Sequence, residues 1–129
     1  KVVYRMIDPE QYVGRKVLVV GGGDSALEAA ARIAEQPNAE VVLSYRGDAF
    51  NRARAKNRDR VDELIDAGRI TALLSSTVER IKEKDVEIKV AGELRFIPND
   101  DVIICAGGLL PTQFLNDVGV AIETKYGTV

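Results

Sequence analysis

Apolar residues along the chain fall into short runs whose spacing predicts strands alternating with helices. Three nearly continuous apolar runs are typical of strands covered on both faces: residues 17–20, 41–45 and 70–74. Apolar positions at helical spacing, most of them alanine, predict a helix over residues 24–36. A second amphipathic helix is predicted around Val61 and Leu64, ending at Gly68. This order of elements is half of a doubly wound parallel sheet.

The pattern changes after the third strand. Three segments alternate apolar and polar residues between short turns, which predicts an antiparallel meander over about residues 77–97. Residues 102–106 are again a continuous apolar run. Right-handed crossovers place the first strand centrally, with the second and third on one side and this last strand on the other. We therefore expect an α/β fold: a Rossmann-like half sheet with helices on its faces plus the meander, in three β/β/α layers.

The chain length of 129 residues suits one domain. We expect a connector over residues 1–16, a core over residues 17–108, and a tail over residues 109–129 that leads out of this domain. Apolar residues make up 46% and charged residues 29%, which is ordinary for a folded soluble domain. The net charge of -2 and the absence of a long apolar run give no reason to expect a nucleic acid or membrane partner.

The chain has one cysteine, Cys105, and no histidine. A single cysteine excludes an internal disulfide and is compatible with a cytoplasmic location. The lack of histidine excludes Ser-His-Asp triads and most zinc sites. We expect Cys105 to be a buried, inert thiol, and we expect neither a catalytic residue nor a metal site in this chain. A bound cofactor would carry any reaction.

Residues 21–26 carry the pattern Gly-x-Gly-x-x-Ala between a predicted strand and a predicted helix. Gly21 would permit a tight turn, Gly23 would let a pyrophosphate approach the backbone, and Ala26 would let the helix pack on the strand. The free amides at the helix start attract phosphate, and Asp24 or Ser25 is expected to cap some of them. The predicted dinucleotide contacts at this turn are Gly21, Gly22, Gly23, Asp24, Ser25 and Ala26.

The second strand ends in Ser44-Tyr45-Arg46, without the Asp or Glu that usually binds the ribose of NAD or FAD. Arg46 is suited to a 2′-phosphate, with the Ser44 hydroxyl and Arg52 as further contacts. This favours NADP(H), although NAD(H) remains open, and it argues against a methyltransferase. Tyr45 or Arg46 is expected to stack on the adenine. The other basic residues, from Arg54 onward, are interpreted as an exposed helix face.

Two further places are candidate contacts. Glu28 lies one turn into the predicted helix, near the expected nicotinamide ribose, although an exposed helix glutamate explains it equally well. Gly107 and Gly108 follow the last predicted strand and would let a cofactor pass close to the backbone, unless they form a plain turn.

Residues 21–28, 44–50 and 105–112 together resemble the thioredoxin reductase type of flavoprotein, which binds two dinucleotides. In that family an NADPH-binding domain is inserted into an FAD-binding domain, so the resemblance implies FAD in a longer parent chain. Gly47 stands where thioredoxin reductases usually carry a second arginine. Residues 4–7 lack the Cys-x-x-Cys of those enzymes. The chain is therefore more similar to ferredoxin–NADP reductases of this type or to bacillithiol-disulfide-reductase-like proteins.

The resemblance implies that the domain holds NADPH for hydride transfer to the flavin of its parent. The chain alone would then bind nucleotide without turnover. Its expected partner is the FAD-binding domain of the same parent, while the electron acceptor and a homodimeric parent stay open. A nucleotide-sensing Rossmann module without redox chemistry is the alternative.

Overall fold

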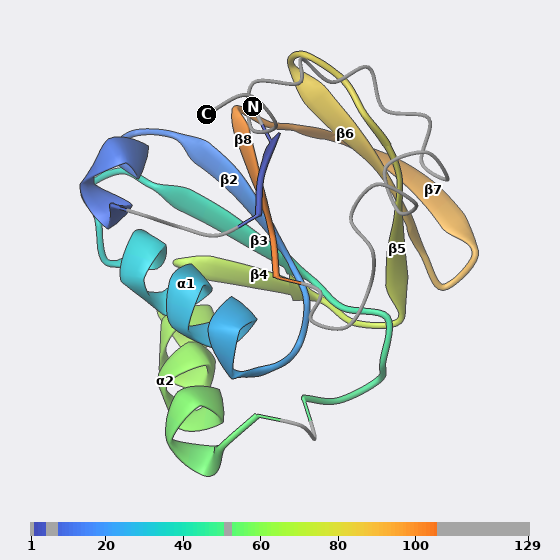
Figure 1. Cartoon of the computed structure of the whole chain (residues 1–129). Coiled ribbons are helices and arrows are strands. Elements are labelled where there is room, and N and C mark those ends of the chain that lie inside the picture. Colours follow the sequence, from blue (N-terminus) through green and yellow to red (C-terminus); the bar gives the residue numbers. More distant parts are fainter. Residues whose placement is uncertain (1, 5–7, 51–52, 106–129) are drawn as a thin grey trace.

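The computed structural model describes residues 2–4, 8–50 and 53–105 and contains a parallel sheet at its centre (Figure 1). Its five strands follow the order β1-β8-β2-β3-β4. The order places β2 between β3 and β8, as right-handed crossovers predicted. The strands are β1 (Val2–Val3), β2 (Lys16–Val20), β3 (Glu40–Ser44), β4 (Ile70–Leu73) and β8 (Asp101–Ile104).

Both helices, α1 (Asp24–Ala34) and α2 (Ala55–Asp66), cover one face of this sheet (Figure 1). The small side chains of α1 are the reason that it lies close to the strands. Leu27, Ala30 and Ala34 are fully buried and share a core cluster with Val17 and Val19 of β2. Tight packing of this kind brings the amino end of α1 directly to the carboxyl end of β2.

A three-stranded antiparallel meander covers the opposite face (Figure 1). Its strands are β5 (Ser76–Ile81), β6 (Asp85–Val90) and β7 (Glu93–Pro98). Val86 and Ile88 of β6 are buried with Leu18 and Val102, which alternate along their strands with the residues that face the helices. The predicted α/β class and its three β/β/α layers are confirmed.

The described residues among the first sixteen contain secondary structure that the predicted connector did not include. Val2 and Val3 form β1 and pair in parallel with β8. Residues Pro9–Tyr12 form a 3-10 helix, and Tyr12 is buried in the helix-side core. A two-residue strand and a single-turn helix are too short for apolar periodicity to reveal.

The ends of the helices differ in detail from the prediction. The N-cap of α1 is Gly23, and neither Asp24 nor Ser25 caps the helix with its side chain, so the predicted side-chain cap is wrong. The predicted turn at Gly68 is confirmed by its φ of 76°. The predicted tail and residue 106 of the last predicted strand lie outside the described residues. Neither described helix is long and apolar enough to cross a membrane.

Candidate functional site

The turn between β2 and α1 packs directly against the end of β8. Gly21 has a φ of 138°, a conformation that residues with a side chain rarely adopt. A β-carbon at Gly21 would stand 2.8 Å from the carbonyl oxygen of Cys105 and 3.1 Å from Cβ of Ala26. The tight turn therefore requires glycine at position 21, and the buried Ala26 has to be small.

The amides at the start of α1 are the candidate anion-binding groups of this turn. The Gly21 amide donates to the Ser44 carbonyl at 2.9 Å, within the β2–β3 ladder. The first bond inside α1 runs from the Leu27 amide to the Gly23 carbonyl, at 3.1 Å. The amides from Gly23 to Ala26 have no acceptor among the residues that the structure describes. Four such donors at a helix start are suited to a phosphate group.

The space beside Gly23 is open. No atom of the described structure lies within 4 Å of a β-carbon built on Gly23. With φ of -89° and ψ of -175°, the backbone at this position accommodates any residue. The packing around Gly23 therefore gives no reason for glycine. Ser25 is exposed beside it.

Asp24 ties the start of α1 to the start of α2. Its Oδ1 accepts hydrogen bonds from the Arg54 amide and from Nδ2 of Asn57, each at 2.8 Å. The backbone bond from Arg54, followed by the bond from Asn57, lowers the pKa of the Asp24 carboxyl. Glu28 is exposed, and its Oε1 accepts from the same Asn57 amide at 3.4 Å. What Asp24 can offer an anion is its backbone amide.

Ser44 lies elsewhere than we expected. Its side chain is 1% exposed, and its hydroxyl oxygen lies 2.7 Å from the hydroxyl oxygen of Ser76. The Ser76 hydroxyl also donates to the Leu73 carbonyl at 2.6 Å. The pair joins the parallel sheet to the meander, because Ser44 ends β3 and Ser76 begins β5. The interpretation of Ser44 as a phosphate contact is corrected accordingly: the hydroxyl serves the joint between the two sheets.

Residues 45–47, which follow Ser44, form a loop that backbone hydrogen bonds hold in place. The Tyr45 carbonyl accepts from the Ser76 amide at 3.0 Å, and the Gly47 carbonyl accepts from the Ser75 amide at 2.8 Å. Arg46, between them, is exposed and forms no ion pair with any residue in the described ranges. Its backbone is held while its guanidinium stays available to an anion.

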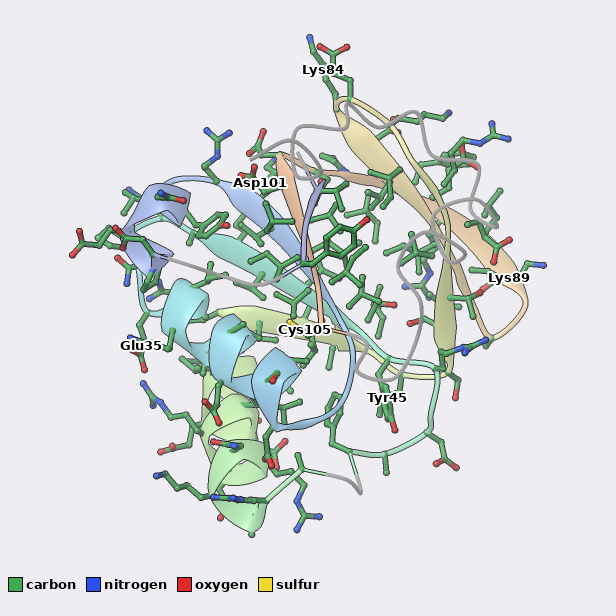
Figure 2. The ribbon with its side chains drawn as sticks, in the orientation of Figure 1. Glu35, Tyr45, Lys84, Lys89, Asp101 and Cys105 are labelled. Atoms are coloured by element: carbon green, nitrogen blue, oxygen red, sulfur yellow. The ribbon has the colours of Figure 1, made fainter. Side chains whose placement is uncertain are left out.

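The Tyr45 side chain occupies the space between this loop and the glycine turn (Figure 2). Its ring lies against Gly22 and stacks on Phe50, with ring centroids 5.5 Å apart. Sequence reasoning gave no indication of this contact. The turn and the loop thus meet at one edge of the sheet, where the carboxyl ends of β2 and β3 lie side by side.

The remaining candidates are placed only in part. Arg52, Gly107 and Gly108 lie outside the described residues. Burial raises the pKa of the half-buried Cys105 thiol to about 11, which is consistent with an inert thiol. The Arg54 side chain is 83% exposed but forms an ion pair with Asp24 at 3.7 Å, and Arg58 is half-buried, so the interpretation of these basic residues as an exposed face holds only in part. No cluster of metal-ligating side chains occurs in the described part of the chain.

Comparison with known proteins identifies the family. The sequence profile of the pyridine nucleotide-disulphide oxidoreductases matches residues 1–129. The chain belongs to this family. A ferredoxin–NADP reductase of Lactobacillus acidophilus is 30% identical over 126 residues, and one of Ignicoccus hospitalis is 33% identical over 130 residues. Each alignment covers 95% of this pyridine nucleotide-disulphide oxidoreductase chain and 40% of the relative.

Solved structures place the chain in the same group. A bacillithiol disulfide reductase of Staphylococcus aureus is 27% identical, with a TM-score of 0.79 over 95% of this chain and 37% of its own. A thioredoxin reductase of Lactococcus lactis is 25% identical, with a TM-score of 0.72 over 82% of this chain and 36% of its own. The resemblance to the thioredoxin reductase type is confirmed, and the chain spans about 40% of the length of the curated relatives.

Proposed function

We propose that this chain is the NADPH-binding domain of a flavin-dependent oxidoreductase and positions the nicotinamide for hydride transfer to FAD. The observation that carries the proposal is the row of amides from Gly23 to Ala26, which have no acceptor among the described residues and begin at the open space beside Gly23. Backbone amides at a helix start are a general means of binding pyrophosphate. Membership of the family and the names of the ferredoxin–NADP reductase relatives support the same nucleotide.

The chain's own residues would divide the work of holding NADPH. The amides of Gly23, Asp24 and Ser25 would bind the pyrophosphate, and Gly22 and Ala26 would shape the turn. The guanidinium of Arg46 would bind the 2′-phosphate through paired N–H donors. The absence of a carboxylate at the end of β3 favours NADPH over NADH, because that carboxylate would repel a phosphate. Glu28, Tyr45, Arg52, Gly107 and Gly108 remain proposed contacts at this edge, and Ser44 is left out.

The flavin half of the reaction is assigned to the rest of the parent protein. Because the chain spans about 40% of its relatives, the FAD site and the electron acceptor would lie outside it. FAD, once bound there, would supply the hydride acceptor, and its domain would be the main partner of this one. A cytoplasmic location belongs to the proposal because a reducing compartment suits the single free thiol, Cys105.

Calorimetric titration of the chain with NADPH and with NADH tests the proposal. We expect NADPH to bind more tightly. Arg46→Ala should weaken NADPH at least about tenfold, because it removes hydrogen bonds to a charged group, and should leave NADH nearly unchanged. Arg95→Ala is the matched control, since Arg95 is an exposed arginine on β7 of the meander.

The outcomes separate the parts of the proposal. No heat with either nucleotide at millimolar concentration would reject nucleotide binding. Equal affinities for NADPH and NADH would reject only the role of Arg46. Loss of flavin absorbance when NADPH is added to the parent protein supports the oxidoreductase, whereas binding without flavin reduction indicates a nucleotide-sensing module.

A further inference from the structure

The ring of Tyr45 is enclosed by residues from two parts of the chain. A β-carbon built on Gly22 would come far closer than 3.0 Å to Cδ1 and Cε1 of the ring. A β-carbon on Gly47 would stand 2.7 Å from Cε2, on the other edge of the same ring. Phe50 stacks on the ring with an angle of 24° between the planes. One edge of Tyr45 therefore contacts the glycine turn, and the other contacts the loop that carries Arg46.

This arrangement explains two glycines that the backbone does not explain. Neither Gly22 nor Gly47 has a positive φ, so no left-handed conformation requires glycine at either position. Any side chain there would overlap the ring, because real Cβ atoms essentially never come within 3.0 Å of another heavy atom. We infer that both positions are glycine because of Tyr45.

The ring therefore connects two groups that the proposed nucleotide needs at once. The glycine turn presents the amides from Gly23 to Ala26, which have no acceptor within the described ranges. The loop presents Arg46, and its carbonyl groups are fixed by the amides of Ser75 and Ser76. Tyr45 fills the space between turn and loop, so its ring limits how closely the amides and the guanidinium approach each other.

We propose that Tyr45 is a positioning residue that sets the spacing between the pyrophosphate site and the 2′-phosphate site. This inference rests on the proposed function. Tyr45 acts through Gly22 and Arg46, so its role does not require contact between the ring and the nucleotide. Loss of the ring affects NADPH more than NADH, because only NADPH carries a phosphate at both places.

A double-mutant cycle on the 129-residue chain tests the proposal, with NADPH and NADH affinities measured by calorimetry. Gly22→Ala and Tyr45→Ala each weaken NADPH about tenfold, the first by forcing the ring and the turn apart. The double variant binds no more weakly than Tyr45→Ala, because removal of the ring makes room for the new methyl group. Tyr45→Phe, which keeps the ring, retains more affinity than Tyr45→Ala.

Circular dichroism confirms that each variant is folded at the titration temperature. Phe96→Ala is the control, because Phe96 is an aromatic residue 61% exposed on β7, and it leaves both affinities unchanged. If Tyr45→Ala does not fold, Tyr45→Leu removes the ring while keeping apolar volume, and the same cycle applies.

Three results would overturn the inference. Additive losses in the double variant would show that Gly22 and Tyr45 do not act through each other. An unchanged ratio of NADPH to NADH affinity in Tyr45→Ala, with only a lower unfolding temperature, would reduce the ring to a structural role. A wild-type chain that binds neither nucleotide would reject the proposed function and this inference together. If the wild type binds NADPH but the losses of the two single variants add in the double variant, only the inference is rejected.

Discussion

Alanine at Gly21 should mainly reduce stability, whereas alanine at Gly23 should mainly reduce nucleotide affinity, although the two positions belong to one turn. At Gly21 the new residue would have to adopt a φ of 138°, with its β-carbon 2.8 Å from the Cys105 carbonyl oxygen. Backbone strain of this kind costs about 1–3 kcal/mol, and forced overpacking costs about as much again. Gly21→Ala should therefore lower the free energy of unfolding by about 2–6 kcal/mol, a large part of the stability of an ordinary domain.

At Gly23 the same substitution meets no obstacle within the described structure. The backbone already has angles suited to alanine, and no atom lies within 4 Å of the new methyl group. Stability should fall by at most about 1 kcal/mol, because Gly23 is the N-cap of α1 and alanine is a poorer N-cap than glycine, while alanine also restricts the unfolded chain. The methyl group would, however, occupy the space in front of the amides that we assign to the pyrophosphate. NADPH affinity should fall at least about tenfold.

Urea unfolding and nucleotide titration of the two variants check these values. The chain has no tryptophan, so unfolding is best followed by far-ultraviolet circular dichroism. The reasoning about the turn is refuted if Gly23→Ala loses as much stability as Gly21→Ala. It is equally refuted if Gly23→Ala binds NADPH as tightly as the wild type does.

Two further predictions concern buried groups near the site. Ser44→Ala should lower the free energy of unfolding by about 1 kcal/mol, because the buried hydroxyl pair with Ser76 is lost, and should leave NADPH affinity unchanged. A selective loss of NADPH affinity would instead restore Ser44 to the phosphate site. Burial raises the pKa of Cys105 from 9.0 to about 11, so the unfolded thiol ionises first as the pH rises. The stability that the buried neutral thiol contributes is therefore complete below pH 9.0 and declines as the pH rises to about 11. In urea unfolding measured across this pH range, the wild type should lose stability more steeply than Cys105→Ala. Parallel curves of stability against pH would contradict the prediction.

The sequence predicted the frame of the site because that frame depends on local patterns. The alanines of α1 and the glycines of the turn lie within one strand–turn–helix unit, so their spacing alone indicates how they pack. The strand order also followed, because right-handed crossovers leave few arrangements for parallel strands.

The sequence did not predict contacts between residues that meet only after the strands pair. Tyr45 meets Gly22 because β2 and β3 lie in register, with Val20 opposite Ser44. Ser44 meets Ser76 because the meander folds back on the end of β3. In each case the polar or aromatic residue was interpreted as a ligand contact, because a single sequence shows which groups can bind and not which partners the fold provides.

The Asp24 carboxylate lowers the attraction of this edge of the sheet for negative charge. Two helices begin here, and each concentrates roughly half a positive elementary charge at its start. Asp24 accepts hydrogen bonds from the beginning of α2, so its negative charge offsets the field of that helix. The Arg54 guanidinium lies 3.7 Å from the other oxygen of Asp24, so an approaching anion experiences two positive helix ends and a carboxylate that an exposed arginine partly neutralises.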